Sequence, residues 1–213
     1  MSVTFSDLAT AAYCPRQLYY ARRDDDRGPP PGVARVKADA HRYPDILDGA
    51  EPATDAIAAA EYRRRLRHLK RRDPTRWAAL VDPSERAVVV SGRDCRGVVE
   101  KVLPGPVPVL VSSGRPPERG VWEPQSVRAV AAAKALAYRE GTPVERAVVE
   151  YPAHATVRTV RMTGRRKAAY RRALRTVRSL DGPPSRTDDD AKCDACDYRA
   201  ECGVPTRSLR SLL

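Results

Sequence analysis

The chain has few aromatic residues, few histidines and no long apolar run. Of its 213 residues 6% are aromatic and three are histidine. No apolar stretch approaches the ~18 residues of a membrane-spanning helix, so we expect no membrane association. The opening residues, MSVTFSDLATAAYCP, lack a basic leader followed by an apolar segment, and no secretory signal is expected. Together these features predict a cytoplasmic protein in a reducing compartment.

Acidic residues are outnumbered by basic ones. The chain carries 39 Lys and Arg residues against 27 Asp and Glu, a formal net charge of +12. Arginine supplies all but six of those cations. Guanidinium groups match the geometry of phosphate oxygens, so a polyanion is the expected class of partner. The alternative is a solvated basic surface that binds nothing.

Three of the five cysteines, Cys193, Cys196 and Cys202, have a C-x2-C-x5-C spacing that suggests a ligand set. Cys14, which precedes Pro15 at a helix break, is the expected fourth ligand. Thiols in a reducing compartment favour metal or cluster ligation over disulfides. The chain has neither a second C-x2-C nor a spaced histidine pair, which structural zinc sites usually contain. Three clustered thiolates and a distant fourth are typical of an iron–sulfur cluster, with zinc as the alternative. Cys95 is expected to be a buried thiol.

The periodicity predicts an α/β fold with a mixed central sheet flanked by helices. Helices are expected over residues 5–22, with a break at Pro15, and over 53–72, 124–141 and 164–180. Strands are expected over 86–103 as a hairpin, and over 106–112, 144–152 and 155–163. The strand 106–112 is wholly apolar and should be central and buried. We expect one domain, 1–213, with a helical part (1–80), an α/β core (86–180) and a cysteine segment (190–203).

The segments YCPRQLYY and KCDACDYRAEC, with strands and helices between them, resemble the CRISPR-associated Cas-four family of RecB-like exonucleases. The resemblance covers essentially the whole chain and implies a restriction-endonuclease-like core. It implies that the four cysteines hold a four-iron, four-sulfur cluster that clasps the two ends of the domain. It also implies a role in spacer acquisition, handling single-stranded DNA ends beside a CRISPR integrase. A RecB-like DNA repair factor is the alternative.

The catalytic residues of that family are largely replaced. In the family an Asp and a Glu hold Mg²⁺ or Mn²⁺, and a Lys two residues after the Glu orients the attacking water. The resemblance places His41 at the family's histidine and Glu100, in RGVVEKV, at the metal-binding Asp. In PVLVSSGRP, Leu110 stands at the Glu and Ser112 at the Lys. We therefore expect a degenerate nuclease site.

A rearranged active site is the alternative to a degenerate one. The family's Gln-x3-Tyr falls near Val130 and Lys134, so that pattern is altered as well. An active single-strand exonuclease would have a rearranged site around Glu100, Glu118 or Glu123, and Lys134.

Two basic runs, EYRRRLRHLKRR (61–72) and GRRKAAYRRALRTVR (164–178), are the candidate DNA contacts. The predicted contacts in the second run are Arg165, Arg166, Arg171 and Arg172. Those in the first are Arg63, Arg64, Arg67 and Arg71. Tyr62 and Tyr170 lie within the runs and are predicted to stack on bases. The alternative is that both runs are solvated helix faces.

Overall fold

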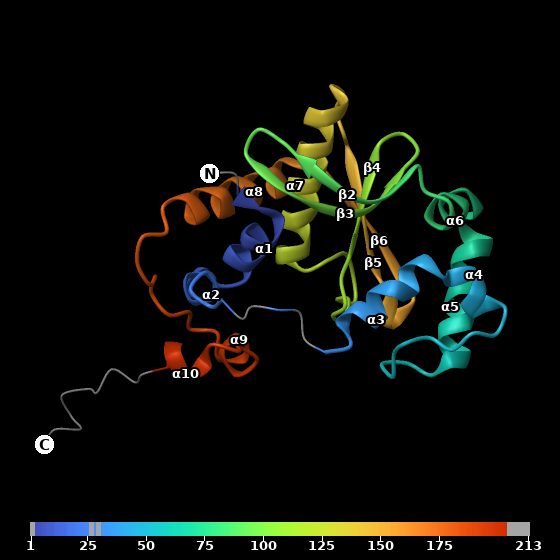
Figure 1. The fold of residues 1–213 in the computed structure, drawn as a ribbon, viewed down its shortest axis with the longest axis horizontal. Helices are drawn as coiled ribbons and strands as arrows, with labels where there is room; N and C mark the ends of the chain where they lie inside the picture. Colours follow the sequence, from blue (N-terminus) through green and yellow to red (C-terminus); the bar gives the residue numbers. More distant parts are fainter. Residues whose placement is uncertain (1–2, 26–27, 29–30, 204–213) are drawn as a thin grey trace, which may run out of the picture.

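A computed structural model of the chain describes residues 3–25, 28 and 31–203. It is an α/β fold in which a mixed six-stranded sheet is packed against helices (Figure 1). The strands are β1 (Val3–Thr4), β2 (Glu85–Ser91), β3 (Cys95–Leu103), β4 (Val107–Val111), β5 (Arg146–Tyr151) and β6 (Thr156–Arg161). The path β1-β3-β4-β5-β6 is parallel at β1–β3 and β4–β5, and β2 pairs with β3 antiparallel. The predicted α/β fold, with a mixed central sheet packed against helices, is confirmed.

One face of the sheet is covered by the N-terminal helices and the two long helices of the core. They are α1 (Phe5–Tyr13), α2 (Pro15–Ala21), α7 (Glu123–Glu140) and α8 (Gly164–Arg178). Their apolar side chains form the main core with Val99 and Leu110 of the sheet. A Cβ atom added to Gly97 would lie only 2.3 Å from the ring of Phe5. Glycine at that strand position therefore allows α1 to approach β3 closely.

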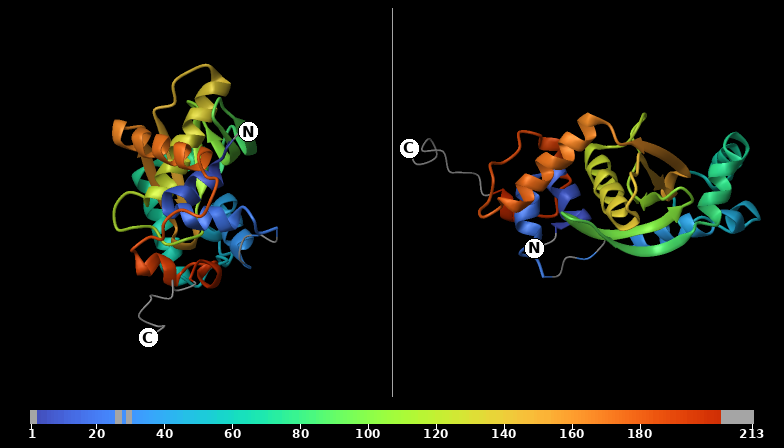
Figure 2. Two further views of the ribbon diagram at one scale, coloured as in Figure 1. Left: turned by 90° about the vertical axis from the view of Figure 1, so that its left-hand side faces the viewer. Right: turned by 90° about the horizontal axis from the view of Figure 1, so that it is seen from above.

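The other face carries shorter helices. They are α3 (Val33–Ala38), η1 (Asp39–His41), α4 (Tyr43–Leu47), α5 (Ala59–Arg72) and α6 (Pro74–Val81). A second core of Tyr43, Tyr62 and Trp77 lies beneath them against Val111 of the sheet. A 3₁₀ turn, η2 (Pro152–His154), joins β5 to β6. The cysteine segment, α9 (Asp190–Asp194) and α10 (Arg199–Cys202), lies at the opposite end of the molecule from α5 and α6 (Figures 1 and 2).

Most expected elements are present, with one clear error of length. Pro15 breaks the first helix as predicted, and all five residues of β4 are buried. The helix expected over 53–72 begins only at Ala59. The backbone N–H of Ala53 donates to Asp39 at 2.7 Å and that of Ala56 to Thr54 at 3.1 Å. These side chains offer the backbone an alternative to helix.

In the described part of the chain, no helix has the length and apolar character needed to cross a membrane.

Candidate functional site

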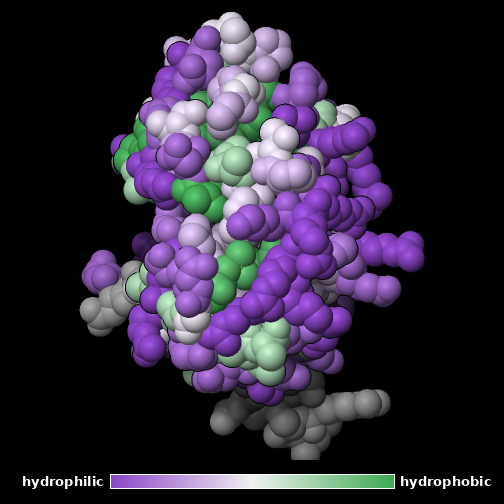
Figure 3. Space-filling view, turned by 90° about the vertical axis from the view of Figure 1, so that its right-hand side faces the viewer, coloured by the Kyte–Doolittle hydropathy of each residue, from purple (hydrophilic) through white to green (hydrophobic). Residues whose placement is uncertain are grey.

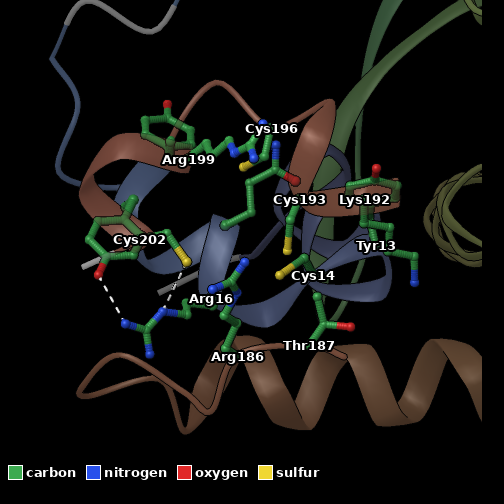
Figure 4. A pocket seen from close by; sticks show the side chains of 14 residues that line it. Tyr13, Cys14, Arg16, Arg186, Thr187, Lys192, Cys193, Cys196, Arg199 and Cys202 are labelled. Carbon is green, nitrogen blue, oxygen red and sulfur yellow. Dashed lines mark hydrogen bonds between the residues drawn. The ribbon is translucent and has the colours of Figure 1, made fainter. Parts of the chain in front are cut away.

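The four cysteines singled out by their spacing line one pocket (Figure 4). Cys14 comes from the junction of α1 and α2, and the other three come from the α9–α10 segment. Cys14 is extended, with φ −156° and ψ 114°, because Pro15 restricts the residue before it and begins α2. In Figure 4 the sulfurs of Cys14 and Cys193 point toward one another. The structure thus brings Cys14 close to the cysteine segment, which the sequence motifs linked only as parts of one expected ligand set.

Arg16 and Tyr198 attach the cysteine segment to α2. The guanidinium of Arg16 donates from Nε to Cys202 Sγ at 3.1 Å and from Nη1 to the carbonyl of Pro184 at 2.8 Å. The Tyr198 ring stacks on Tyr20 with centroids 6.4 Å apart, and its hydroxyl donates to Asp24 at 2.8 Å. These contacts hold the cysteine segment against α2, and the spacing of the cysteines did not predict them.

The pocket lining is rich in cations, two of which have carboxylate partners outside it: Lys192 lies 3.6 Å from Asp189, and Arg199 lies 3.1 Å from Asp194. Among the residues described, its lining includes no carboxylate and has four cations. These are Arg16, Arg186, Lys192 and Arg199. Burial raises the pKa of the Cys196 thiol, and the charges of Cys14 and Cys202 raise it further. Ligation would therefore have to deprotonate this thiol against its surroundings, while the cations would stabilise an anionic thiolate centre.

Four cysteines are the donor set of an iron–sulfur cluster or of a zinc ion. Within residues 3–25, 28 and 31–203, no group of three or more His, Cys, Asp or Glu side chains is close enough to hold a metal ion. All four cysteines nevertheless line the one pocket. Cys95 is buried elsewhere, 3.5 Å from the Tyr170 hydroxyl.

Glu100 is paired with cations. The β3–β4 register pairs Lys101 with Val109, which places Glu100 opposite Leu110 on the same face. Leu110 is buried in the main core. The nearest oxygen of Glu100 lies 3.9 Å from Lys37 Nζ and 3.9 Å from Arg128 Nη2. Arg128 also donates to the carbonyl of Val111 at 3.2 Å. A guanidinium therefore lies between β3 and β4, where the resemblance predicts a metal ion.

The residues of the alternative, rearranged metal site have other surroundings in the structure. Glu123 pairs with Arg172 on the surface at 3.4 Å. Glu118 is exposed in the loop before α7. Lys134 lies over the ring of Tyr170, 5.8 Å from its centroid, in a pocket with Cys95. These side chains are held by other partners or by solvent, so none completes a site at Glu100.

His41 lies at the end of η1 with its ring exposed. Its Nδ1 is 3.3 Å from a guanidinium nitrogen of Arg86. The ionic partners of Glu100 are instead Lys37 and Arg128, so His41 and Glu100 have different partners. Partial desolvation lowers the pKa of His41, and the charges of Lys101 and Arg86 lower it further. These surroundings favour the neutral ring.

Some of the predicted DNA-contacting arginines are exposed, and others are held by backbone carbonyls. On α8, Arg165, Arg171 and Arg172 are exposed, while Arg166 is half-buried and donates to the carbonyl of Arg161 at 3.0 Å. On α5, Arg64, Arg67 and Arg71 are exposed, but Arg63 is held by carbonyls of residues 46, 49 and 50.

Base stacking by Tyr62 and Tyr170 was a wrong prediction. Tyr62 is 0% and Tyr170 1% exposed, so both are core residues. Tyr62 and Leu66 recur at helical spacing, and that apolar stripe was the signal for burial.

One ionic pair had no sequence signal. Lys101 and Glu150 are both completely buried and 3.0 Å apart, beneath α4 and α5. They are 49 residues apart in sequence, so only the fold brings them together.

Comparison of the sequence with known proteins found no match. No protein-family model matches the chain, and no curated protein matches it.

Proposed function

We propose that this chain is an iron–sulfur, DNA-binding protein that resembles the Cas-four family and holds DNA without cleaving it. The observation that carries the proposal is the single pocket lined by Cys14, Cys193, Cys196 and Cys202. The resemblance suggests a CRISPR integrase as its protein partner and single-stranded DNA ends as its ligand, in spacer acquisition.

The cysteine pocket supports a structural cofactor. Cys14 would contribute the ligand from the N-terminal helices, and the other three would contribute ligands from α9–α10. When bound, a four-iron, four-sulfur cluster supplies four strong metal–thiolate bonds that join the two ends of the chain. Arg16, which contacts Cys202, positions the segment for that joining.

The surroundings of Glu100 support a protein that does not cleave. Mg²⁺ keeps several waters and is bound through carboxylates, which it needs in near-ideal geometry. Here the carboxylate at the expected position already has two cationic neighbours, Lys37 and Arg128. The adjacent strand offers Leu110 in place of a second carboxylate. Mg²⁺ or Mn²⁺ would be required only if the chain were an active exonuclease.

The exposed arginines of α8 support DNA binding. Helix α8 lies at the same end of the molecule as the cysteine segment (Figures 1 and 2). Arg165, Arg171 and Arg172 extend into solvent there. Each phosphate that an arginine neutralises releases counterions, so binding should weaken steeply with salt.

The test measures binding and cleavage on the same anaerobically prepared sample. End-labelled single-stranded and duplex DNA are incubated with the protein at low salt, with Mg²⁺ or Mn²⁺. We expect retarded but intact DNA. Cleavage that is lost in Glu100→Gln would contradict the proposal, and so would a failure to bind either DNA at low salt.

A further inference from the structure

A second basic surface lies far from the cysteine pocket. A groove of about 950 Å³ runs between helices α5 and α6 and the edge strand β6. Six arginines line it: Arg64, Arg65, Arg71, Arg72, Arg76 and Arg158. On the face that carries α5 and α6, hydrophilic side chains form a ridge beside small apolar patches (Figure 3). Helices α5 and α6, which line the groove, lie at the opposite end of the molecule from the cysteine segment (Figure 2).

The groove carries an excess of positive charge. In the described lining, two carboxylates, Glu61 and Asp73, face the six arginines, which leaves four positive charges uncompensated. Glu61 accepts from Nε of Arg64 and from Nε of Arg65, each at 2.6 Å. These hydrogen bonds are the main cause of the lowered pKa of Glu61. Asp73 pairs with Arg76 at 3.2 Å.

The arginines on the two sides of the groove are held in place by the fold. Arg65 donates to the carbonyl of His154 at 3.1 Å, which ties α5 to the turn before β6. Arg158 donates to the carbonyl of Glu118 at 3.4 Å. Arg71 and Arg72, by contrast, are exposed at the end of α5. The ordered guanidinium groups lose less side-chain entropy when they bind phosphates, so the groove differs from a solvated helix face. The exposed Arg71 and Arg72 add phosphate contacts at its end.

The lining also indicates which form of nucleic acid fits. Proteins that bind single strands combine positive charge with aromatic side chains on which bases stack. Among the described residues the lining contains no Phe, Tyr or Trp, its apolar members are Leu69, Ala155 and Val157, and its one ring is the imidazole of His68. Binding would therefore depend mainly on phosphate contacts. Arg64 and Arg71 are two helical turns apart, about 11 Å. A duplex carries one charge per ~1.7 Å of its axis, so several phosphates lie within that span.

We propose that this groove binds the phosphate backbone of duplex nucleic acid without reading its sequence. The inference rests on the proposed function as a DNA-binding protein, and adds to it a second surface and a second form of DNA. A duplex held between α5, α6 and β6 would leave the α8 arginines and the cysteine end free for another segment or for a partner.

The test compares two matched pairs of adjacent arginines. Arg71→Gln with Arg72→Gln alters the groove, and Arg171→Gln with Arg172→Gln alters α8. Anisotropy titrations of a 20-bp duplex and of a single strand of equal length are run across a range of salt. We expect the groove pair to weaken duplex binding about tenfold or more at 0.1 M salt and to reduce the log–log salt slope by ~1.8. Single-strand binding should stay within about twofold of wild type.

Further arms separate the outcomes. Arg71→Lys with Arg72→Lys keeps both charges and should retain duplex binding, and thermal unfolding checks that each variant is folded. If wild type binds duplex but the groove pair leaves its affinity and slope unchanged, the groove proposal fails while the proposed function stands. If wild type binds no DNA, the proposed function itself fails. Polyglutamate that competes better than duplex would identify an acidic protein as the ligand and overturn the groove proposal.

Discussion

The ammonium of Lys101 on β3 lies 3.0 Å from the carboxylate of Glu150 on β5, and neither side chain is exposed to solvent. Strand β4 separates the two strands, so the pair bridges across the centre of the sheet. Lys101 also donates to the carbonyl of Ala40 at 2.5 Å, which ties η1 to the sheet. Removing one partner of such a pair leaves an uncompensated buried charge, whereas replacing both with apolar residues is often tolerated.

The first prediction concerns the free energy of unfolding. Lys101→Met and Glu150→Leu should each cost about 3–5 kcal/mol, while the double variant should be more stable than either single variant. Urea denaturation measures all three. Arg172→Gln is the control, because its partner Glu123 is largely exposed, and such surface pairs contribute at most about 1 kcal/mol. Additive costs in the double variant would show that the two side chains do not form a coupled pair.

The second prediction is a pH dependence. Burial raises the pKa of Glu150 from 4.5 to about 6, with the charge of Lys101 opposing the rise. In Lys101→Met the opposing charge is gone, so the pKa should rise further. The folded state then binds the proton more tightly than the unfolded state. The free energy of unfolding should therefore fall as pH rises from 4.5 through the raised pKa, by roughly 1.4 kcal/mol for each pH unit that separates the unfolded from the folded pKa.

Unfolding curves of Lys101→Met and wild type at pH 5 and pH 8 check this sign. The variant should lose more stability than wild type between the two. A variant that is equally stable at both values would place Glu150 in contact with solvent.

The sequence predicted the elements with strong local patterns. Pro15 marked the break between α1 and α2, and the apolar run at β4 marked a buried strand. The short helices α4 and α6 were missed because each begins with a proline near its N-terminus, which reads as a helix breaker. Helices of five to eight residues form through tertiary packing rather than propensity. Asp73, which caps α6 ahead of Pro74, was a usable signal.

In the candidate site, too, local patterns were predicted and long-range contacts were not. The spacing of Cys193, Cys196 and Cys202 predicted a ligand set, because sequence neighbours stay neighbours in the fold. The contact of Arg16 with Cys202 joins residues 186 positions apart, so no local pattern could predict it. The cations around Glu100 come from α3 and α7, and no sequence pattern indicated that Arg128 would reach β3.

The third prediction concerns Mn²⁺. Wild-type protein should show no Mn²⁺ bound at Glu100 by electron paramagnetic resonance, since Lys37 and Arg128 lie 3.9 Å from the carboxylate and their positive charges disfavour a cation there. Lys37→Gln with Arg128→Gln should expose that charge and allow weak binding, which Glu100→Gln should then abolish. DNA cleavage should still be absent, because a single carboxylate supplies too few ligands. Tight Mn²⁺ binding by wild type that depends on Glu100 would contradict this account.

The fourth prediction concerns Arg16, whose fork joins Cys202 and the carbonyl of Pro184. Arg16→Ala should loosen the segment from residue 184 to 203, and limited proteolysis should cut it faster than in wild type. Arg23→Ala is the matched control, because Arg23 lies just after the same helix and its guanidinium is stacked on Tyr19, 3.6 Å from the ring centroid. Equal cleavage rates in the two variants would show that Arg16 does not fasten the segment.

The content of iron and acid-labile sulfide in anaerobically purified protein tests the central claim most directly. We predict about four of each per chain and a broad visible absorbance, since four thiolates suit a four-iron cluster. Cys14→Ser should lose the cluster as completely as Cys196→Ser, because both line the one pocket. Cys95→Ala should keep it, because Cys95 is buried against Tyr170 instead. One zinc per chain without iron, or a cluster unaffected by Cys14→Ser, would contradict the account.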